Sequence, residues 1–190
     1  MTKNLKISLI LLCILIGIYF IINKKQNNLI SKSTSIFLDN PNDIFKILIQ
    51  KENDAIELIR MDTTWKISGN DTLIIKQRSL DNFFDNVLKV NRETIISEDP
   101  TKYDKYSITD SLGTHLALIN SIGDTSAYYI FGRSRSDYSR SYVRVNIDPR
   151  VYLANQNVIY MLSTQENYWG EKQKKEIFPP ASVPSNSETN

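Results

Sequence analysis

The segment IFKILIQKENDAIELIRMDTTWKI, residues 44–67, decides the fold class of this chain. Within it, apolar and polar side chains alternate in three short runs, at 44–50, 55–61 and 64–68. Because successive side chains of a strand point to opposite faces of a sheet, this alternation predicts an antiparallel meander of three strands. Trp65 and Ile67 share one face of the third strand, and we expect them to pack against Ile56 or Leu58.

The strongest helical pattern of the soluble part follows soon after, in residues 79–90 (SLDNFFDNVLKV). Its apolar residues recur at the spacing of a helix that buries one face, and they are Leu80, Phe83, Phe84, Val87, Leu88 and Val90. Ser79 can cap the N-terminus of this helix. Asp81 in the first turn and Lys89 in the last turn suit the helix dipole.

Further short runs predict strands after this helix, at residues 94–97, 116–120, 127–131, 142–145 and 151–154. A second helix is expected after Asn155 or Asn157, with Trp169 packed back over it. The predicted fold class is therefore α+β, with antiparallel β meanders and hairpins and one or two helices packed on one face. One N-terminal transmembrane helix is expected to precede this domain.

The transmembrane prediction rests on the run from Ile7 to Ile22, ISLILLCILIGIYFII, which has lysines on both sides. A spanning segment must be helical because its backbone groups find no water partners in hydrocarbon. At about 1.5 Å per residue the run reaches roughly 24 Å, and the flanking lysine side chains can extend it towards the headgroups. No small-residue cleavage site follows, and Leu12 precedes Cys13 where a lipoprotein signal has a small residue. An uncleaved signal anchor is therefore preferred over a cleaved signal peptide or a lipid anchor.

This reading divides the chain into a transmembrane signal anchor (1–23), a polar stalk (24–42), an α+β domain (43–178) and a disordered tail (179–190). We expect a single-pass protein of the inner (cytoplasmic) membrane of a bacterial cell envelope, with its C-terminal domain extracytoplasmic, on the periplasmic side. The lysines on the two sides of the anchor nearly balance, so a domain that faces the cytosol stays open as an alternative.

Composition argues against most catalytic chemistries. His115 is the only histidine, which excludes a multi-histidine metal site. Asp104, Asp110 and Asp124 lie in predicted turns, where aspartate commonly serves as a turn former. We therefore expect no catalytic, cofactor-binding or metal-binding residues, no cofactor and no enzymatic activity. A carboxylate-dependent envelope hydrolase or transferase is the alternative. The formal net charge of +2 argues against a nucleic-acid partner.

One segment has the composition of a binding site: GRSRSDYSRSYVR, residues 132–144. Arginine binds carboxylates and phosphates through two hydrogen bonds, and tyrosine can stack on flat or apolar ligand surfaces. The candidate residues for binding an anion or a partner are Arg133, Arg135, Arg140, Arg144, Tyr138 and Tyr142. The simpler interpretation is a solvated hairpin tip without a ligand.

A series of motifs in a fixed order resembles domain-of-unknown-function family 4340. It starts with Asp43-Ile44-x-x-Ile47-x-Ile49 and Ile56-Glu57-Leu58-x-Arg60-x-Asp62-x-x-Trp65-x-Ile67, and continues with Tyr106-Ser107-Ile108, Ile130-Phe131-Gly132, Tyr142-Val143 and Val151-Tyr152. The resemblance covers about Asp43 to Trp169. Two residues depart from the family pattern, because Ser107 replaces the usual glycine and Ile108 replaces leucine.

This resemblance implies a membrane-tethered auxiliary component of a gliding-motility-type ABC transporter. The family offers no functional residues to carry across. The implied partners are the lipid bilayer, through Ile7 to Ile22, and membrane proteins such as transporter subunits. We therefore expect a membrane-anchored extracytoplasmic accessory or binding module that is possibly associated with an ABC-type transport or motility complex.

Overall fold

A computed structural model describes residues 12, 14–16, 18, 30–37 and 40–173 of the chain. Most of the expected membrane segment, 7–22, lies outside these residues, and those of it that are described are helical. Within the described residues, no helix is both long enough and apolar enough to span a bilayer. The tail expected at 179–190 also lies outside the described residues.

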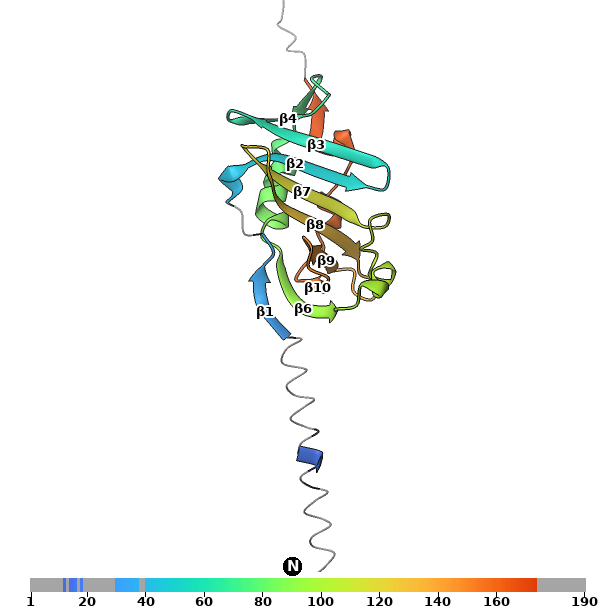
Figure 1. Ribbon diagram of the computed structural model, residues 1–190. Helices are drawn as coiled ribbons and strands as arrows, with labels where there is room; N and C mark the ends of the chain where they lie inside the picture. Colours follow the sequence, from blue (N-terminus) through green and yellow to red (C-terminus); the bar gives the residue numbers. More distant parts are fainter. Residues whose placement is uncertain (1–11, 13, 17, 19–29, 38–39, 174–190) are drawn as a thin grey trace, which may run out of the picture.

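The domain is built on one antiparallel sheet of nine strands (Figure 1). In spatial order the strands are β1 (Ile30–Ser35), β6 (Asn91–Ser97), β10 (Val151–Ala154), β9 (Ser141–Val145), β8 (Thr125–Arg133), β7 (Thr114–Asn120), β2 (Ile44–Lys51), β3 (Asp54–Met61) and β4 (Thr64–Ile67). A second, two-stranded sheet pairs β5 (Leu73–Ile75) with β11 (Gly170–Lys172). The α+β class and its antiparallel strands are thereby confirmed.

A helical segment covers one face of the sheet and lies behind β2, β7 and β8 in Figure 1. It consists of α2 (Gln77–Asn82) and a π-helical turn, η2 (Phe83–Val87). Phe83 is fully buried and meets the ring of Trp169 edge to face, with ring centroids 6.2 Å apart. Trp169 comes from the short helix α3 (Glu166–Trp169). The C-terminal part of the chain therefore closes the same core that the helix begins.

The predicted buried face of this helix is confirmed for Leu80, Phe83, Val87, Leu88 and Val90, whereas Phe84 is only half-buried. The predicted cap is wrong, because the helix begins at Gln77. Ser79 is instead buried inside the helix, and its hydroxyl donates a hydrogen bond of 2.7 Å to the carbonyl oxygen of Tyr168. This contact joins residues that are far apart in the sequence, which a local capping pattern cannot reveal.

The strand pairing confirms the expected packing of the meander. Ile67 lies opposite Leu58 in register, as expected, whereas Trp65 lies opposite Arg60, and the centroid of its ring is 5.8 Å from that of Phe84 in η2. The second expected helix is much shorter than predicted. It is one 3₁₀ turn, η5 (Ile159–Met161), and the side chain of Asn157 accepts a hydrogen bond from its first backbone N–H.

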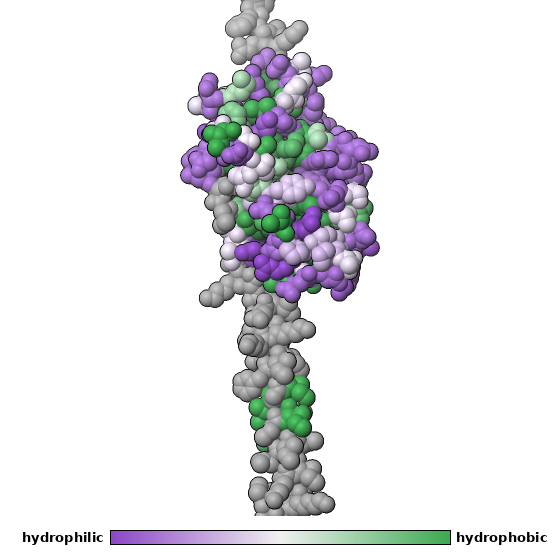
Figure 2. Space-filling view, viewed as in Figure 1, coloured by the Kyte–Doolittle hydropathy of each residue, from purple (hydrophilic) through white to green (hydrophobic). Residues whose placement is uncertain are grey.

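The opposite face of the sheet is covered only in part. Two 3₁₀ turns, η3 (Pro100–Lys102) and η4 (Asp104–Tyr106), lie on this face, and Tyr106 and Ile108 pack there against Ile130 and Val151. Over β2, β3 and β7 the face stays open, and Figure 2 shows polar and apolar residues interspersed on it. Lys46 of β2 and Glu57 of β3 form an ion pair of 3.0 Å on this open face.

Residues 99–113, which contain η3 and η4 and which we call the covering segment, lie close to the sheet. This arrangement bears on two positions of the family motif. Gly132 lies under η4, and a Cβ atom built there would be 2.1 Å from the carbonyl oxygen of Tyr106. Ser107 adopts a left-handed backbone with φ of 53°. Glycine is the residue that adopts this conformation most readily, which fits the glycine that the family resemblance places at this position.

The structure also moves the N-terminal boundary of the domain. Part of the range assigned to a stalk, 24–42, belongs to the fold, because β1 pairs with β6. After β1, Ile36 and Phe37 are buried, and the Phe37 ring lies 4.4 Å from that of Tyr129. The sequence of this range looks polar overall because strand β1 is at a sheet edge, where few apolar side chains are needed.

Candidate functional site

The six residues proposed as a binding site do not form one cluster. Arg144 and Tyr142 lie on β9 and face the covering segment. The guanidinium of Arg144 stacks over the Tyr103 ring at 4.6 Å and lies 3.5 Å from the Asp110 carboxylate. Tyr142 meets the ring of Tyr106 edge to face at 5.0 Å. These two candidates therefore hold the covering segment on the sheet.

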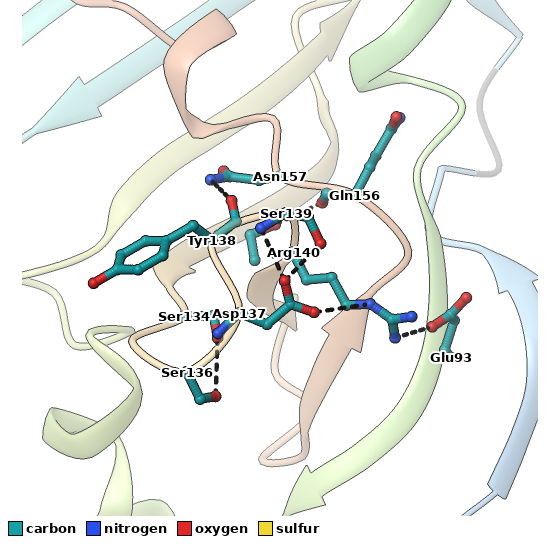
Figure 3. A network of polar contacts seen from close by, with 10 residues as sticks. Glu93, Ser134, Ser136, Asp137, Tyr138, Ser139, Arg140, Gln156 and Asn157 are labelled. Atoms are coloured by element: carbon teal, nitrogen blue, oxygen red, sulfur yellow. Dashed lines mark hydrogen bonds and ion pairs between the residues drawn. The ribbon is translucent and has the colours of Figure 1, made fainter.

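Arg140 is also engaged in the fold, as Figure 3 shows. Its guanidinium forms an ion pair of 2.6 Å with Glu93 on β6 and a second, of 3.3 Å, with Asp137 in its own loop. Arg140 thus ties the loop between β8 and β9 to strand β6. Side-chain and backbone hydrogen bonds from Ser139, followed by the charge of Arg140, lower the pKa of the Asp137 carboxyl.

The loop between β8 and β9, residues 134–140, is firmly held rather than a free tip. Ser134 is buried, and its hydroxyl accepts a hydrogen bond of 3.2 Å from the backbone N–H of Asp137. The amide of Asn157 donates a hydrogen bond of 3.0 Å to the carbonyl oxygen of Tyr138. The ring of Tyr138 points away from this polar network in Figure 3 and is 75% exposed. The loop therefore holds its backbone fixed and presents one aromatic ring outward.

Arg133, Arg135 and Tyr138 line two adjoining hollows, of about 530 and 320 Å³, which we call the strand-end groove. The larger hollow contains Arg133 and Tyr138, and the smaller one contains Arg133 and Arg135. The two hollows share the residues Lys51, Glu52, Thr114, Arg133 and Ile159. A cavity volume of this size is in the range of small-molecule sites.

Strand pairing explains why these residues meet. Lys51 at the end of β2 pairs with Thr114 at the start of β7, and Thr114 pairs with Phe131 of β8. Arg133 follows Phe131 by two residues, so the alternation of a strand puts both on the same face. The side chains on the core-facing side of β2, β7 and β8 continue past the end of the core, and the groove forms there.

Sequence reasoning did not predict several residues of the groove. Lys51 ends β2, Glu52 follows it, and Asp54 begins β3. Tyr160, which is 66% exposed, comes from η5. In the sequence it lies among apolar residues in a segment expected to be helical, so nothing marked it as a surface residue. No sequence pattern could bring Tyr160 next to Lys51.

The charged side chains of the groove fall into two groups. Among the described residues, Lys51, Arg133 and Arg135 have no ion pair or side-chain hydrogen bond, and all three are exposed. Glu52 and Asp54 are also exposed and line the larger hollow. The described part of the chain has no cluster of histidine, cysteine and carboxylate residues that could hold a metal ion.

The fold defines this protein as an antiparallel α+β domain with a basic groove at one end of its sheet. The family described as Domain of unknown function (DUF4340) matches residues 65–184, and the chain belongs to this family. The match contains Arg133, Arg135, Tyr138 and Tyr160 but begins after Lys51. No curated protein and no solved structure matches the chain.

Proposed function

We propose that this protein is a membrane-anchored, extracytoplasmic binding module that serves as an accessory subunit of an ABC-type transport or motility complex and performs no catalysis. One observation of the structure carries the binding role: a preformed groove at the sheet end, in which Lys51, Arg133 and Arg135 form no ion pair with another described residue. Elsewhere in the segment 132–144, arginines are paired with carboxylates.

The apolar run 7–22 supports the anchor, because its length and flanking lysines fit one membrane helix. Strand β1 begins at Ile30, so only a short connection separates the end of this run from the domain. At no more than about 3.4 Å per extended residue, this connection would keep the domain near the bilayer surface. Such a position suits a subunit that contacts membrane-embedded partners.

Affinity purification of the full chain from detergent-solubilised membranes tests the accessory role. We expect transporter or other membrane subunits to co-purify with the tagged protein. The control is a chain with the anchor alone, residues 1–29, carrying the same tag. If both samples recover the same proteins, or neither recovers a membrane subunit, the accessory proposal fails.

Protease treatment of intact spheroplasts tests the orientation, and with it the alternative of a cytosol-facing interaction domain. We expect the domain to be digested while a cytosolic marker protein survives. A domain that survives until the membrane is permeabilised contradicts the extracytoplasmic proposal.

A second candidate function is a carboxylate-dependent envelope hydrolase or transferase, which Glu52 and Asp54 in the larger hollow favour. Acid–base catalysis by two carboxyls requires that their environments separate the two pKa values. Both side chains are exposed, so neither carboxyl is buried. Hydrolysis of envelope glycans by the purified protein, abolished by Glu52→Gln, would favour this candidate over the non-catalytic one.

A further inference from the structure

We infer that the strand-end groove binds an acidic glycan, that is, a chain of sugars that carry carboxylates. This inference rests on the proposed function as a binding module and names the ligand of the groove. Its evidence is the combination of side chains in the groove: unpaired cations, exposed aromatic rings, and carboxylates with amides and hydroxyls beside them.

The cations supply the recognition of negative charge. Lys51, Arg133 and Arg135 come from two different strands and the following loop. Lys51 and Arg133 line both hollows, and Arg135 lines the smaller one. A guanidinium binds a carboxylate through two parallel hydrogen bonds, and an ammonium group adds a point charge. Because the three side chains are exposed and unpaired among the described residues, no internal ion pair has to break when a ligand carboxylate binds.

The aromatic rings supply the contact with the apolar face of a sugar ring. Tyr138 and Tyr160 both line the larger hollow. Both rings are mainly exposed, although an aromatic ring gains more by being covered. The backbone carbonyl of Tyr138 is held by the amide of Asn157, so the backbone that carries this ring is positioned before a ligand arrives.

The remaining polar groups distinguish a glycan from an acidic peptide. Glu52 and Asp54 share the larger hollow with hydroxyls and amides of Thr114, Ser163, Thr164, Asn157 and Gln165. Sugar hydroxyl groups can donate hydrogen bonds to carboxylates and accept them from amides. An acidic peptide made of glutamates has no hydroxyl groups to donate to Glu52 and Asp54, whereas a glycan carries several on each sugar.

The full chain in detergent micelles can be titrated calorimetrically with hexagalacturonic acid as the probe. We expect saturable binding of this oligosaccharide that weakens with added salt, because salt screens charge pairs at the surface. Its fully methyl-esterified form keeps the sugar chain but removes the charges, and hexaglutamate keeps the charges but removes the sugars. We expect both to bind at least about tenfold more weakly, which corresponds to about 1.4 kcal/mol.

Variants of the protein locate the site. Arg133→Gln combined with Arg135→Gln should weaken binding of hexagalacturonic acid by about tenfold or more. Arg78→Gln, an exposed cation of α2 outside the groove, is the matched control and should leave affinity unchanged. Tyr138→Ala and Tyr160→Ala should each weaken binding without changing the thermal midpoint, because both rings are mainly exposed.

Three results would overturn the inference: no binding of hexagalacturonic acid to the wild-type chain, hexaglutamate binding as tightly as the glycan, or equal losses in the Arg78→Gln and groove variants. The second result would identify an acidic protein segment as the ligand. None of them depends on recovery of membrane subunits, so the glycan inference can fail while the accessory role stands. Conversely, glycan binding without any co-purified subunit would leave the groove assigned and remove the accessory role.

Discussion

Arg133 and Arg135, at the start of the arginine-rich segment, carry the same side chain as Arg140 and Arg144 at its end, but the two pairs have different surroundings. The second pair is held by Glu93, Asp137, Asp110 and the ring of Tyr103. The first pair has no acidic partner among the described residues and faces the strand-end groove. One half of the segment therefore stabilises the fold, and the other half lines the strand-end groove.

The difference follows from where the strands place each residue. Arg144 lies opposite Ile130 in register, on the face that the segment 99–113 covers, so its guanidinium is enclosed by that segment. Arg133 ends β8 on the other face, where the core stops. Charged side chains that are enclosed must be paired, whereas those at a strand end can stay solvated. Substitutions that compare the two halves can confirm or reject this division.

The largest effect is expected where the segment begins, at Gly132. In Gly132→Ala the new Cβ would meet the Tyr106 carbonyl and the Ile108 side chain, so the covering segment must shift. We expect a loss of about 3 kcal/mol in the free energy of unfolding, measured by urea denaturation. Gly123→Ala is the control, since it has a positive φ but open space around it, and should cost about 1 kcal/mol. Equal losses would show that the close contact with η4 has no special role.

The enclosed arginine comes next. Arg144→Gln removes the stacking on Tyr103 and the ion pair with Asp110, and should lower the free energy of unfolding by about 1–2 kcal/mol. The gain from removing the buried Nε atom, which has no hydrogen-bond partner among the described residues, limits this loss. Affinity of the groove for an anionic ligand should not change. A stable variant that has lost ligand affinity would place Arg144 in the site.

A direct comparison pairs Arg140→Gln with Arg135→Gln. The first change breaks the contacts with Glu93 and Asp137 and should cost about 1 kcal/mol, because both ion pairs are partly exposed. The second should change the free energy of unfolding by less than about 0.5 kcal/mol, as is usual for exposed sites. Urea denaturation of both variants under identical conditions measures the difference. If Arg135→Gln were the more damaging change, the assignment of the two halves would be reversed.

The smallest expected effect is a change of stability with pH at Asp148, whose carboxylate forms an ion pair with Arg150. Burial acts to raise the pKa of Asp148, but hydrogen bonds from Arg150 and Tyr152 outweigh it and lower this pKa to about 2. Because the pKa is lower in the folded state, the carboxylate stabilises the protein above its ordinary pKa of 3.8, and this contribution is lost as the pH falls towards 2. Solvent screening limits it to less than about 1 kcal/mol.

Urea denaturation at pH 6 and near pH 3, where roughly half of that contribution is lost, checks this expectation. The wild-type chain should lose more stability between the two pH values than Asp148→Asn, in which the titrating group is absent. Identical losses in the two proteins would show that the contacts of Asp148 with Arg150 and Tyr152 do not depend on its charge.

Most of the sheet could be predicted from local patterns. The meander of β2, β3 and β4 and the buried face of α2–η2 follow from apolar periodicity, which depends only on neighbours in the sequence. Strand β1 and the correct start of α2 could not be predicted, because β1 depends on pairing with β6 and Ser79 on a contact with Tyr168. Both are long-range contacts that periodicity does not encode.

The candidate site was predicted in part. The choice of an arginine- and tyrosine-rich segment led to the groove, but only Arg133, Arg135 and Tyr138 line it. The sequence does not indicate that Glu93 would form an ion pair with Arg140, because Glu93 lies on β6, far from Arg140 in the sequence. It also has no sign that Lys51 and Tyr160 would join the site.

The sequence by itself determined the α+β class, most strands of the large sheet and the chemistry of its arginine-rich segment, because periodicity and composition are local properties. The tertiary structure alone decided which arginines are free. Pairing of β2 with β7 and of β7 with β8 brings Lys51, Thr114 and Arg133 to one end of the sheet, while Glu93 and Asp110 engage the other arginines. Whether a charged side chain stabilises the fold or stays free for a ligand depends on which residues the folded chain places beside it.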